Sequence, residues 1–362
     1  MLKQLDIYTS RLTSAFVLFF ILSMANVWLD ATSNTVLVLG YRLFILFTPF
    51  FFLFFKNKLT LIAFILAQIG LIMFLKDIYL IGSIFFSLGI AISGYMLKYY
   101  SSKLTTAAAW NKIAINVGSL LAGLAIIINT NTHTNKNTML YVCIIILLVS
   151  TILYERHFIK AKLKNIILTK NDFSLKQLLS PQGIIWGLVG FVTGVKLISF
   201  ASILPQLLIK NLGAIPFWYG IMIMLNSVII VFFQLPITKK MQHIKNPITL
   251  ILPLLLAMIL ILLAPYLYVT TFIGAFLWVL ALSIIECAIT LLDTKAQKSN
   301  ALLSKEAMVG IGSASCVYFV RFFDPEIGSI IIGVISSLFL LLTITLLYFL
   351  KNSPTTTTKT TP

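Results

Sequence analysis

Long apolar runs, separated by short polar gaps, fill almost the whole of this 362-residue chain. An α-helix needs about 20 apolar residues to cross the hydrocarbon core of a bilayer, and most runs have that length. The gaps are too short to hold soluble domains. The pattern predicts an all-α polytopic membrane protein with twelve transmembrane helices. The predicted helices cover residues 12–29, 35–55, 59–75, 78–97, 105–128, 138–154, 183–208, 215–237, 247–265, 268–292, 303–322 and 327–349.

The positive charges fall mainly on alternate gaps. Of the 27 Lys and Arg residues, 21 lie on one set of gaps, four on the other set and two inside runs. Cytoplasmic loops of membrane proteins retain Lys and Arg, whereas translocated loops are depleted of them. The alternation therefore predicts a multi-pass protein of the cytoplasmic (inner) membrane with both termini in the cytoplasm. The cations that we expect in cytoplasmic gaps include Arg11, Lys56, Lys58, Lys98, Lys112, Lys239, Lys240, Lys295 and Lys305.

One gap is longer and more basic than the others. Residues 155–182 carry six cations, and we expect a cytoplasmic linker there, with a short amphipathic helix on the membrane surface. It divides the chain into two predicted six-helix bundles, residues 1–154 and 183–350. Residues 351–362 are rich in threonine, and we expect a disordered tail.

Composition excludes several classes of protein. The chain is 59% hydrophobic and only 10% charged, whereas a soluble domain has about 25% charged residues. The net charge of +17 is spread over many short gaps, which favours contact with lipid headgroups and not with nucleic acid. The sequence contains no catalytic constellation, no metal-ligand spacing and no cofactor motif, so we predict that the protein is not an enzyme. The cysteines and histidines are dispersed: Cys143, Cys287, Cys316, His133, His157 and His243.

Three stretches resemble helices of the major facilitator superfamily. Residues 107–126 (AAAWNKIAINVGSLLAGLAI) resemble its fifth helix, with Gly118 and Gly123 where the antiporter form of that helix has glycines. Residues 218–241 resemble the eighth helix, and residues 306–334 resemble the last two. The resemblance implies a monomeric secondary transporter, in which two six-helix bundles rock around a central site.

The loop motifs of that family are absent. The second gap reads FFKNKL and lacks the usual Gly-x-x-x-Asp pattern, and Phe85 stands where the fourth helix often carries an arginine. The family's gating and proton-linked residues therefore do not carry over to this chain.

Three charged residues lie inside predicted helices. A charge at the bilayer centre costs at least about 2.5–3.5 kcal/mol, so such residues normally face a cavity or a partner. Lys196 lies near the midplane of the seventh helix, Arg42 toward the outer side of the second, and Glu286 in the inner half of the tenth. We assign Lys196 and Arg42 to substrate binding, with Lys196 facing a central cavity. Glu286, as the only carboxylate well inside a predicted helix, is assigned to proton coupling.

Each of these residues also has a structural interpretation. Arg42 would extend to the outer interface, and Glu286 would pair with Lys240 or Lys295 near the inner interface. Lys196 would pair with Glu286, although the two are expected at different depths.

Uncharged residues add weaker candidates. Asn26 and Asn226 are assigned to substrate binding; the alternative for both, and for Asn116, is a hydrogen bond between helices. Gly190 and Gly194 precede the buried lysine of their helix and predict close packing or bending at a gate.

The balance of charge inside the predicted helices is positive. A cavity for cationic drugs needs a buried carboxylate near the midplane, and the sequence has none there. We therefore expect a small anionic or polar metabolite, with carboxylate siderophores in that class, and the antiporter-like glycines favour proton-coupled export. The alternatives are a multidrug efflux antiporter and a non-transporting receptor or scaffold related to transporters.

Overall fold

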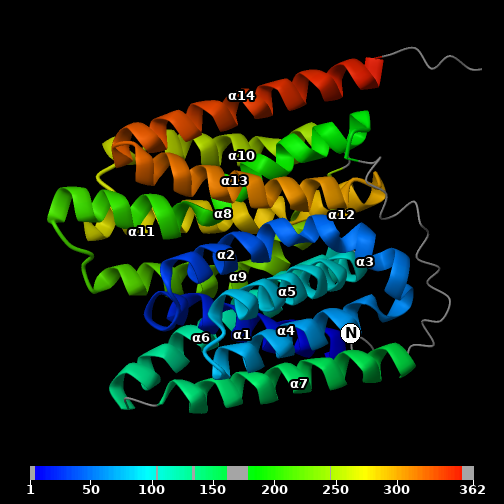
Figure 1. Cartoon of the computed structure of the whole chain (residues 1–362). Helices are drawn as coiled ribbons and strands as arrows, with labels where there is room; N and C mark the ends of the chain where they lie inside the picture. Colours follow the sequence, from blue (N-terminus) through cyan, green and yellow to red (C-terminus); the bar gives the residue numbers. More distant parts are fainter. Residues whose placement is uncertain (1–4, 103–104, 133–134, 161–177, 245, 353–362) are drawn as a thin grey trace, which may run out of the picture.

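The computed structural model describes residues 5–102, 105–132, 135–160, 178–244 and 246–352, and over these residues it is a bundle of long helices without strands (Figure 1). The described residues form fourteen α-helices, and because α2 runs on into α3 and α11 into α12, these make twelve rods. In the N-terminal half these are α1 (Leu5–Trp28), α2 (Ala31–Leu43) with η2 (Phe44–Phe47) and α3 (Thr48–Phe55), α4 (Leu59–Leu75), α5 (Tyr79–Ser101), α6 (Thr105–Thr132) and α7 (Lys136–Lys160).

The C-terminal half supplies the other six rods. They are α8 (Pro181–Leu212), α9 (Trp218–Met241), α10 (Pro247–Leu262), α11 (Phe272–Ile289) with α12 (Leu291–Lys298), α13 (Leu302–Phe322) and α14 (Pro325–Asn352).

Each predicted apolar run overlaps one rod, in agreement with the predicted all-α class. Nine described helices or helix pairs are long and apolar enough to cross a membrane. Of the remaining rods, α4 and α10 are apolar but shorter, and α13 carries Lys305 and Glu306 close to its start. Helices this apolar satisfy their own backbone hydrogen bonds, which is what a chain surrounded by lipid requires.

Side-chain caps mark where several helices begin. Asp30, Ser180 and Thr271 each accept a hydrogen bond from the backbone N–H three residues later, and Asn246 accepts from the N–H two residues later. These bonds satisfy N–H groups that have no partner within the helix. At its far end, α8 stops at Gly213, whose φ of +76° suits a residue without a side chain.

Glycines bring α8 against α13. A Cβ atom on Gly190 would lie 2.1 Å from the Lys305 carbonyl oxygen, and one on Gly194 would lie 2.1 Å from that of Val309. Neither position has room for a side chain, so these glycines set the distance between the two helices.

The two antiporter-like glycines of α6 differ from each other. A Cβ atom on Gly118 would lie 2.5 Å from the Leu12 carbonyl oxygen of α1, whereas one on Gly123 would meet nothing within 4 Å. The resemblance to the family's fifth helix implies that both glycines pack against a neighbouring helix; Gly123 departs from this, because that part of α6 faces open space.

Both described ends of the chain lie at the same end of the bundle, on the right in Figure 1. We call this the termini end and the other the opposite end. The halves meet where α6 packs against α9 and α12 and where α2 packs against α13. Most of the predicted linker, residues 161–177, and the tail from residue 353 lie outside the described residues, so the proposed division at residues 155–182 stays a prediction.

Candidate functional site

Glu286 on α11 lies between two lysines that come from different halves of the chain. Its Oε2 accepts a hydrogen bond from Lys196 Nζ on α8, and its Oε1 forms an ion pair with Lys112 Nζ on α6. The side chains of Lys196 and Glu286 are 0% and 4% exposed. Because water does not reach these charges, each must be stabilised by the opposite charge beside it. We call Lys112, Lys196 and Glu286 the deep cluster.

Two expectations about Lys196 are wrong. Lys196 and Glu286 do meet. Because α8 is 32 residues long and α11 continues into α12, the ends of the apolar runs gave wrong depths for these two side chains. Lys196 also faces no open cavity in this conformation, since its side chain is completely buried beside Glu286 and over the Phe200 ring. The alternative partners expected for Glu286, Lys240 and Lys295, are replaced by lysines from α6 and α8.

A second group of charges lies nearer the termini end. Lys98 Nζ on α5 lies 2.6 Å from Glu306 Oε1 on α13 and 3.0 Å from Asp293 Oδ2 on α12. Lys305 Nζ lies 2.6 Å from Asp293 Oδ1 and 3.5 Å from Glu306 Oε1. We call these four residues the closing cluster, because Lys98 belongs to the N-terminal half and the other three to the C-terminal half.

Several cations that the sequence placed in loops are instead inside helices. Lys98, Lys112 and Lys305 face other helices, and the Lys305 side chain is only 1% exposed. Lys98 lies on a helix because α5 extends to Ser101, beyond the predicted run 78–97. Lys112 and Lys305 lie near the start of the predicted helices 105–128 and 303–322, so they too lie on helix faces. Glu286 is likewise not the only buried carboxylate, because the side chains of Asp293 and Glu306 are 13% and 5% exposed.

Two arginines lie between these groups. Arg42 Cβ on α2 lies 3.0 Å from where a Cβ on Gly310 of α13 would be, and Arg11 Nη1 on α1 lies 3.0 Å from where one on Gly94 of α5 would be. The Nε atoms of both arginines are buried. Arg42 therefore does not extend to the outer interface. Sequence reasoning missed Arg11, because the residue directly precedes the first apolar run.

The asparagine candidates have partners within the protein. Ser283 Oγ on α11 donates a 2.8 Å hydrogen bond to Asn226 Oδ1 on α9, and Asn116 Nδ2 donates to the Lys112 carbonyl oxygen one turn earlier in α6. Asn226 thus joins two helices, which was its alternative role. The side chain of Asn26 lies outside the described part of the structure.

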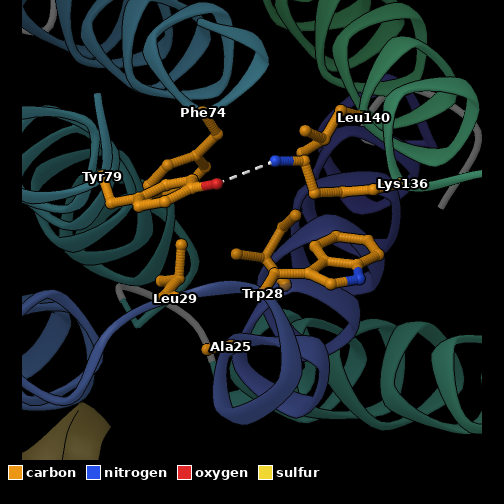
Figure 2. Close-up of a pocket in the computed structure, with 8 residues that line it drawn as sticks. Ala25, Trp28, Leu29, Phe74, Tyr79, Lys136 and Leu140 are labelled. Carbon is orange, nitrogen blue, oxygen red and sulfur yellow. Dashed lines mark hydrogen bonds between the residues drawn. The ribbon is translucent and has the colours of Figure 1, made fainter. Parts of the chain in front are cut away.

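A small pocket lies at the opposite end of the N-terminal half (Figure 2). Tyr79 and Lys136 meet there, with 3.1 Å between Oη and Nζ. About 10 Å³ of free space remains, which is room for about one water molecule. The pocket is too small for an organic solute, and none of the buried charges described above lines it. Its lining residues are Ile21, Ala25, Trp28, Leu29, Phe74, Tyr79, Lys136 and Leu140.

Ion pairs at the opposite end stay within one half. Lys136 Nζ lies 2.6 Å from Asp77 Oδ1 in the N-terminal half, and Lys210 Nζ lies 2.9 Å from Asp324 Oδ2 in the C-terminal half. The described ion pairs that join the halves are those of Lys98 and Lys112. In this conformation, charge pairing holds the halves together in the part of the bundle toward the termini end.

The charges that lie between the helices do not balance. Among the described residues, six cations that are buried or partly buried accompany three carboxylates, which leaves an excess of three positive charges. The closing cluster is neutral, so the excess lies on the deep cluster and on the two arginines. The cations are Arg11, Arg42, Lys98, Lys112, Lys196 and Lys305, and the carboxylates are Glu286, Asp293 and Glu306.

Comparison with solved structures identifies the fold. The human organic anion transporter MFSD10 (TETRAN) is 11% identical and superposes with a TM-score of 0.63, covering 94% of this chain and 98% of that one. The proton:xylose symporter XylE, bound to 6-bromo-6-deoxy-D-glucose, is 14% identical with a TM-score of 0.64, covering 95% and 94%. A POT family transporter in complex with 5-aminolevulinic acid is 13% identical with a TM-score of 0.60, covering 94% and 95%. No family model and no curated protein matches the sequence.

The chain has the fold of the major facilitator superfamily. This confirms the predicted fold class, because the similarity covers nearly the whole of each chain. The ion pairs of Lys112 and Lys98 and the contact of Arg42 with Gly310 lie where the N-terminal half meets the C-terminal half.

Proposed function

We propose that this protein is a secondary transporter that moves a small organic anion across the cytoplasmic membrane. The observation that carries the proposal is the excess of three positive charges between its two halves. Unpaired charge away from water is costly, and an anionic solute that binds there would supply the missing negative charge.

The deep cluster has the chemistry of an anion site. Lys112 and Lys196 share the single carboxylate of Glu286, so an incoming carboxylate can take over either ammonium group. A cationic drug would need a free buried carboxylate instead, and each of the three buried carboxylates already contacts two lysines. This favours the anion over the multidrug alternative. MFSD10, which shares the fold, is an organic anion transporter.

The way in which the charges connect the halves supports alternating access. Movement of the halves apart at the termini end would break the contacts of Lys98 with Asp293 and Glu306, and that of Lys112 with Glu286. The pairs at the opposite end would survive such a movement, because each lies within one half. A rocking movement around the deep cluster would therefore expose it to one side of the membrane at a time.

Glu286 is our proposed coupling residue. A proton on Glu286 would remove the negative charge that Lys112 and Lys196 share, and both ammonium groups would then be free for the solute. Proton binding and anion binding would thus assist each other at one site. Such mutual assistance corresponds to symport. The resemblance of residues 107–126 to antiporter helices favours export instead, so the direction of the gradient-driven flux decides between the two.

Flux measurements on the purified protein in proteoliposomes test this function. We would measure the uptake of a panel of radiolabelled organic acids, amines and neutral sugars with and without a pH gradient. We expect uptake of an organic acid, a loss of at least about tenfold in Lys196→Ala, and partial recovery in Lys196→Arg, which keeps the charge. Lys239→Ala, an exposed lysine at the end of α9, is the matched control and should transport normally.

Two further outcomes of the same measurement decide the alternatives. Uptake of amines but not acids would overturn the anion assignment in favour of multidrug transport. No flux of any compound, from protein that is monodisperse and thermally stable, would favour a receptor or scaffold. For coupling, Glu286→Gln should abolish gradient-driven uptake and keep solute exchange; persistence of gradient-driven uptake would remove Glu286 from the coupling role.

A further inference from the structure

We infer that Arg11 and Arg42 form a second anion site, so that the transported solute carries two anionic groups, one for the arginines and one for the deep cluster. This inference rests on the proposed function and adds the class of substrate. It concerns Arg11, which sequence reasoning treated as a loop residue, as much as Arg42.

The position of Arg11 follows from two residues of α5. Gly94 and Lys98 are four apart, so they lie on the same face of the helix, about one turn from each other. Lys98 points to α13, where it binds Glu306. Arg11 Nη1 lies against Gly94, where the lack of a side chain leaves room for the guanidinium group. Since α5 runs toward the termini end, Arg11 lies about one turn deeper than the closing cluster.

The position of Arg42 follows from α13 in the same way. Glu306 and Gly310 are four apart and share one face, and Arg42 Cβ lies against Gly310. Since α13 runs away from the termini end, Arg42 also lies about one turn deeper than the closing cluster. Lys98 and Glu306 join α5 to α13 at 2.6 Å, so the two arginines approach each other just beyond that contact. Electrostatic coupling of Arg11 with Arg42, and of both with Glu306, agrees with this placement.

The two guanidinium groups lack anionic partners. Within the described residues, neither Arg11 nor Arg42 forms an ion pair with a carboxylate, and the buried Nε of each has no hydrogen-bond partner. Arg42 instead lies over the ring of Tyr41, at 4.8 Å from its centroid. Two adjacent like charges with unused donors repel each other, and a carboxylate or phosphate bound between them would relieve that repulsion and accept several hydrogen bonds.

The spacing between the two sites sets the size of the solute. Glu286 and Asp293 are seven residues apart on the α11–α12 rod, so the deep cluster lies about two turns beyond the closing cluster. The arginines lie about one turn beyond it, which places them roughly 5 Å from the level of Glu286. Two carboxylates that distance apart occur in dicarboxylates of about four to six carbons.

Binding measurements with matched ligands test the inference. Succinate, glutarate and adipate would each be titrated into the full-length protein at low ionic strength, beside the corresponding monomethyl ester, which lacks the second charge. We expect at least one dicarboxylate to bind about tenfold or more tightly than its ester. Arg11→Gln and Arg42→Gln should weaken dicarboxylate binding more than ester binding and so remove most of that difference, whereas Arg11→Lys and Arg42→Lys should retain part of it. Arg321→Gln, an exposed arginine at the far end of α13, is the matched control.

The outcomes separate this inference from the proposed function. If dicarboxylates and esters bind equally, and Arg11→Gln and Arg42→Gln change neither while Lys196→Ala weakens both, the second site is overturned and the anion transporter stands. If no acid of the panel above binds and organic acids show no flux, both are overturned. The thermal stability of each variant, measured without ligand, identifies any loss of affinity that comes from unfolding.

Discussion

Glu286 and Asp293 lie seven residues apart on the α11–α12 rod, and each binds a lysine from the other half of the molecule. Glu286 pairs with Lys112 of α6, and Asp293 pairs with Lys98 of α5 at 3.0 Å. Seven residues are about two helical turns, so both acids lie on one face of the rod. One helix face therefore carries ion pairs of both the deep cluster and the closing cluster across the boundary between the halves.

Charge reversal in the closing cluster should open the termini end. Lys98→Glu would place three carboxylates together beside Lys305, so the halves should separate there. The measurement is the spin-label distance between labels on Lys58 and Lys240, which are exposed on different halves. We expect a longer distance in Lys98→Glu than in the parent.

Two variants control that experiment. The double variant Lys98→Glu/Glu306→Lys restores opposite charges at the contact and should return most of the distance. Lys76→Glu, an exposed reversal at the opposite end, should change nothing. An unchanged distance in Lys98→Glu would contradict a role of this contact in closure.

Removal of the Glu286 charge should destabilise the fold. Glu286→Gln leaves Lys112 and Lys196 without their shared carboxylate, and breaking a buried pair in this way costs about 3–5 kcal/mol. Thermal unfolding in detergent should show a clear drop in Tm. Glu286→Gln/Lys196→Met should recover part of the loss, because it also removes the buried ammonium. Equal stability of Glu286→Gln and the parent would mean that the pair contributes nothing net.

Glycine substitutions should separate packed from open positions. Gly190→Ala and Gly194→Ala would each place a Cβ atom 2.1 Å from a backbone oxygen of α13, which cannot move aside easily. We expect a loss of about 1–3 kcal/mol for either change. Gly123→Ala is the control, since open space surrounds that position, and alanine should stabilise the helix by about 0.5–1 kcal/mol. A destabilising Gly123→Ala would contradict the packing described for α6.

The contact between Asp77 and Lys136 should be sensitive to acid. A hydrogen bond from the Lys136 ammonium lowers the pKa of the Asp77 carboxyl from its ordinary 3.8. Since the folded pKa is the lower one, the stabilisation is complete above the ordinary pKa and disappears as the pH falls through the lowered value. The pKa of Asp77, followed by NMR of its carboxyl carbon, should rise toward 3.8 in Lys136→Ala. No change in that pKa would show that Lys136 does not act on Asp77 in solution.

Membrane orientation is testable from the ends of α9. Phe217, just before α9, is 87% exposed at the opposite end, and Lys239 is exposed near its other end. The distribution of cations predicts that Phe217 faces the outside and Lys239 the cytoplasm. In a cysteine-free background, an impermeant maleimide added to intact cells should label Phe217→Cys and not Lys239→Cys. The reverse pattern would invert the proposed orientation.

The sequence by itself determined the fold class. Apolar runs such as 59–75 and 303–322 became α4 and α13 within one residue at each end, because only a helix satisfies its own backbone in lipid. The close packing of Gly190 and Gly194 was also predictable, since glycines at this spacing line one helix face. The positive balance of charge inside the helices was predicted from the positions of Lys196 and Arg42 against the single carboxylate of Glu286.

Only the tertiary structure decided which charges meet. Lys112 looked like a loop cation, yet it binds Glu286, and Arg11 looked like a flanking cation, yet it lies against Gly94 of α5. A sequence gives the depth of a residue along its own helix, but not how far each helix extends or which neighbour its face meets. Those depend on the packing of all twelve rods. A lysine or arginine side chain is also long enough to place its charge about one helical turn away from the depth of its own Cα atom. The excess of positive charge was therefore predictable, and its arrangement into two clusters and an arginine pair was not.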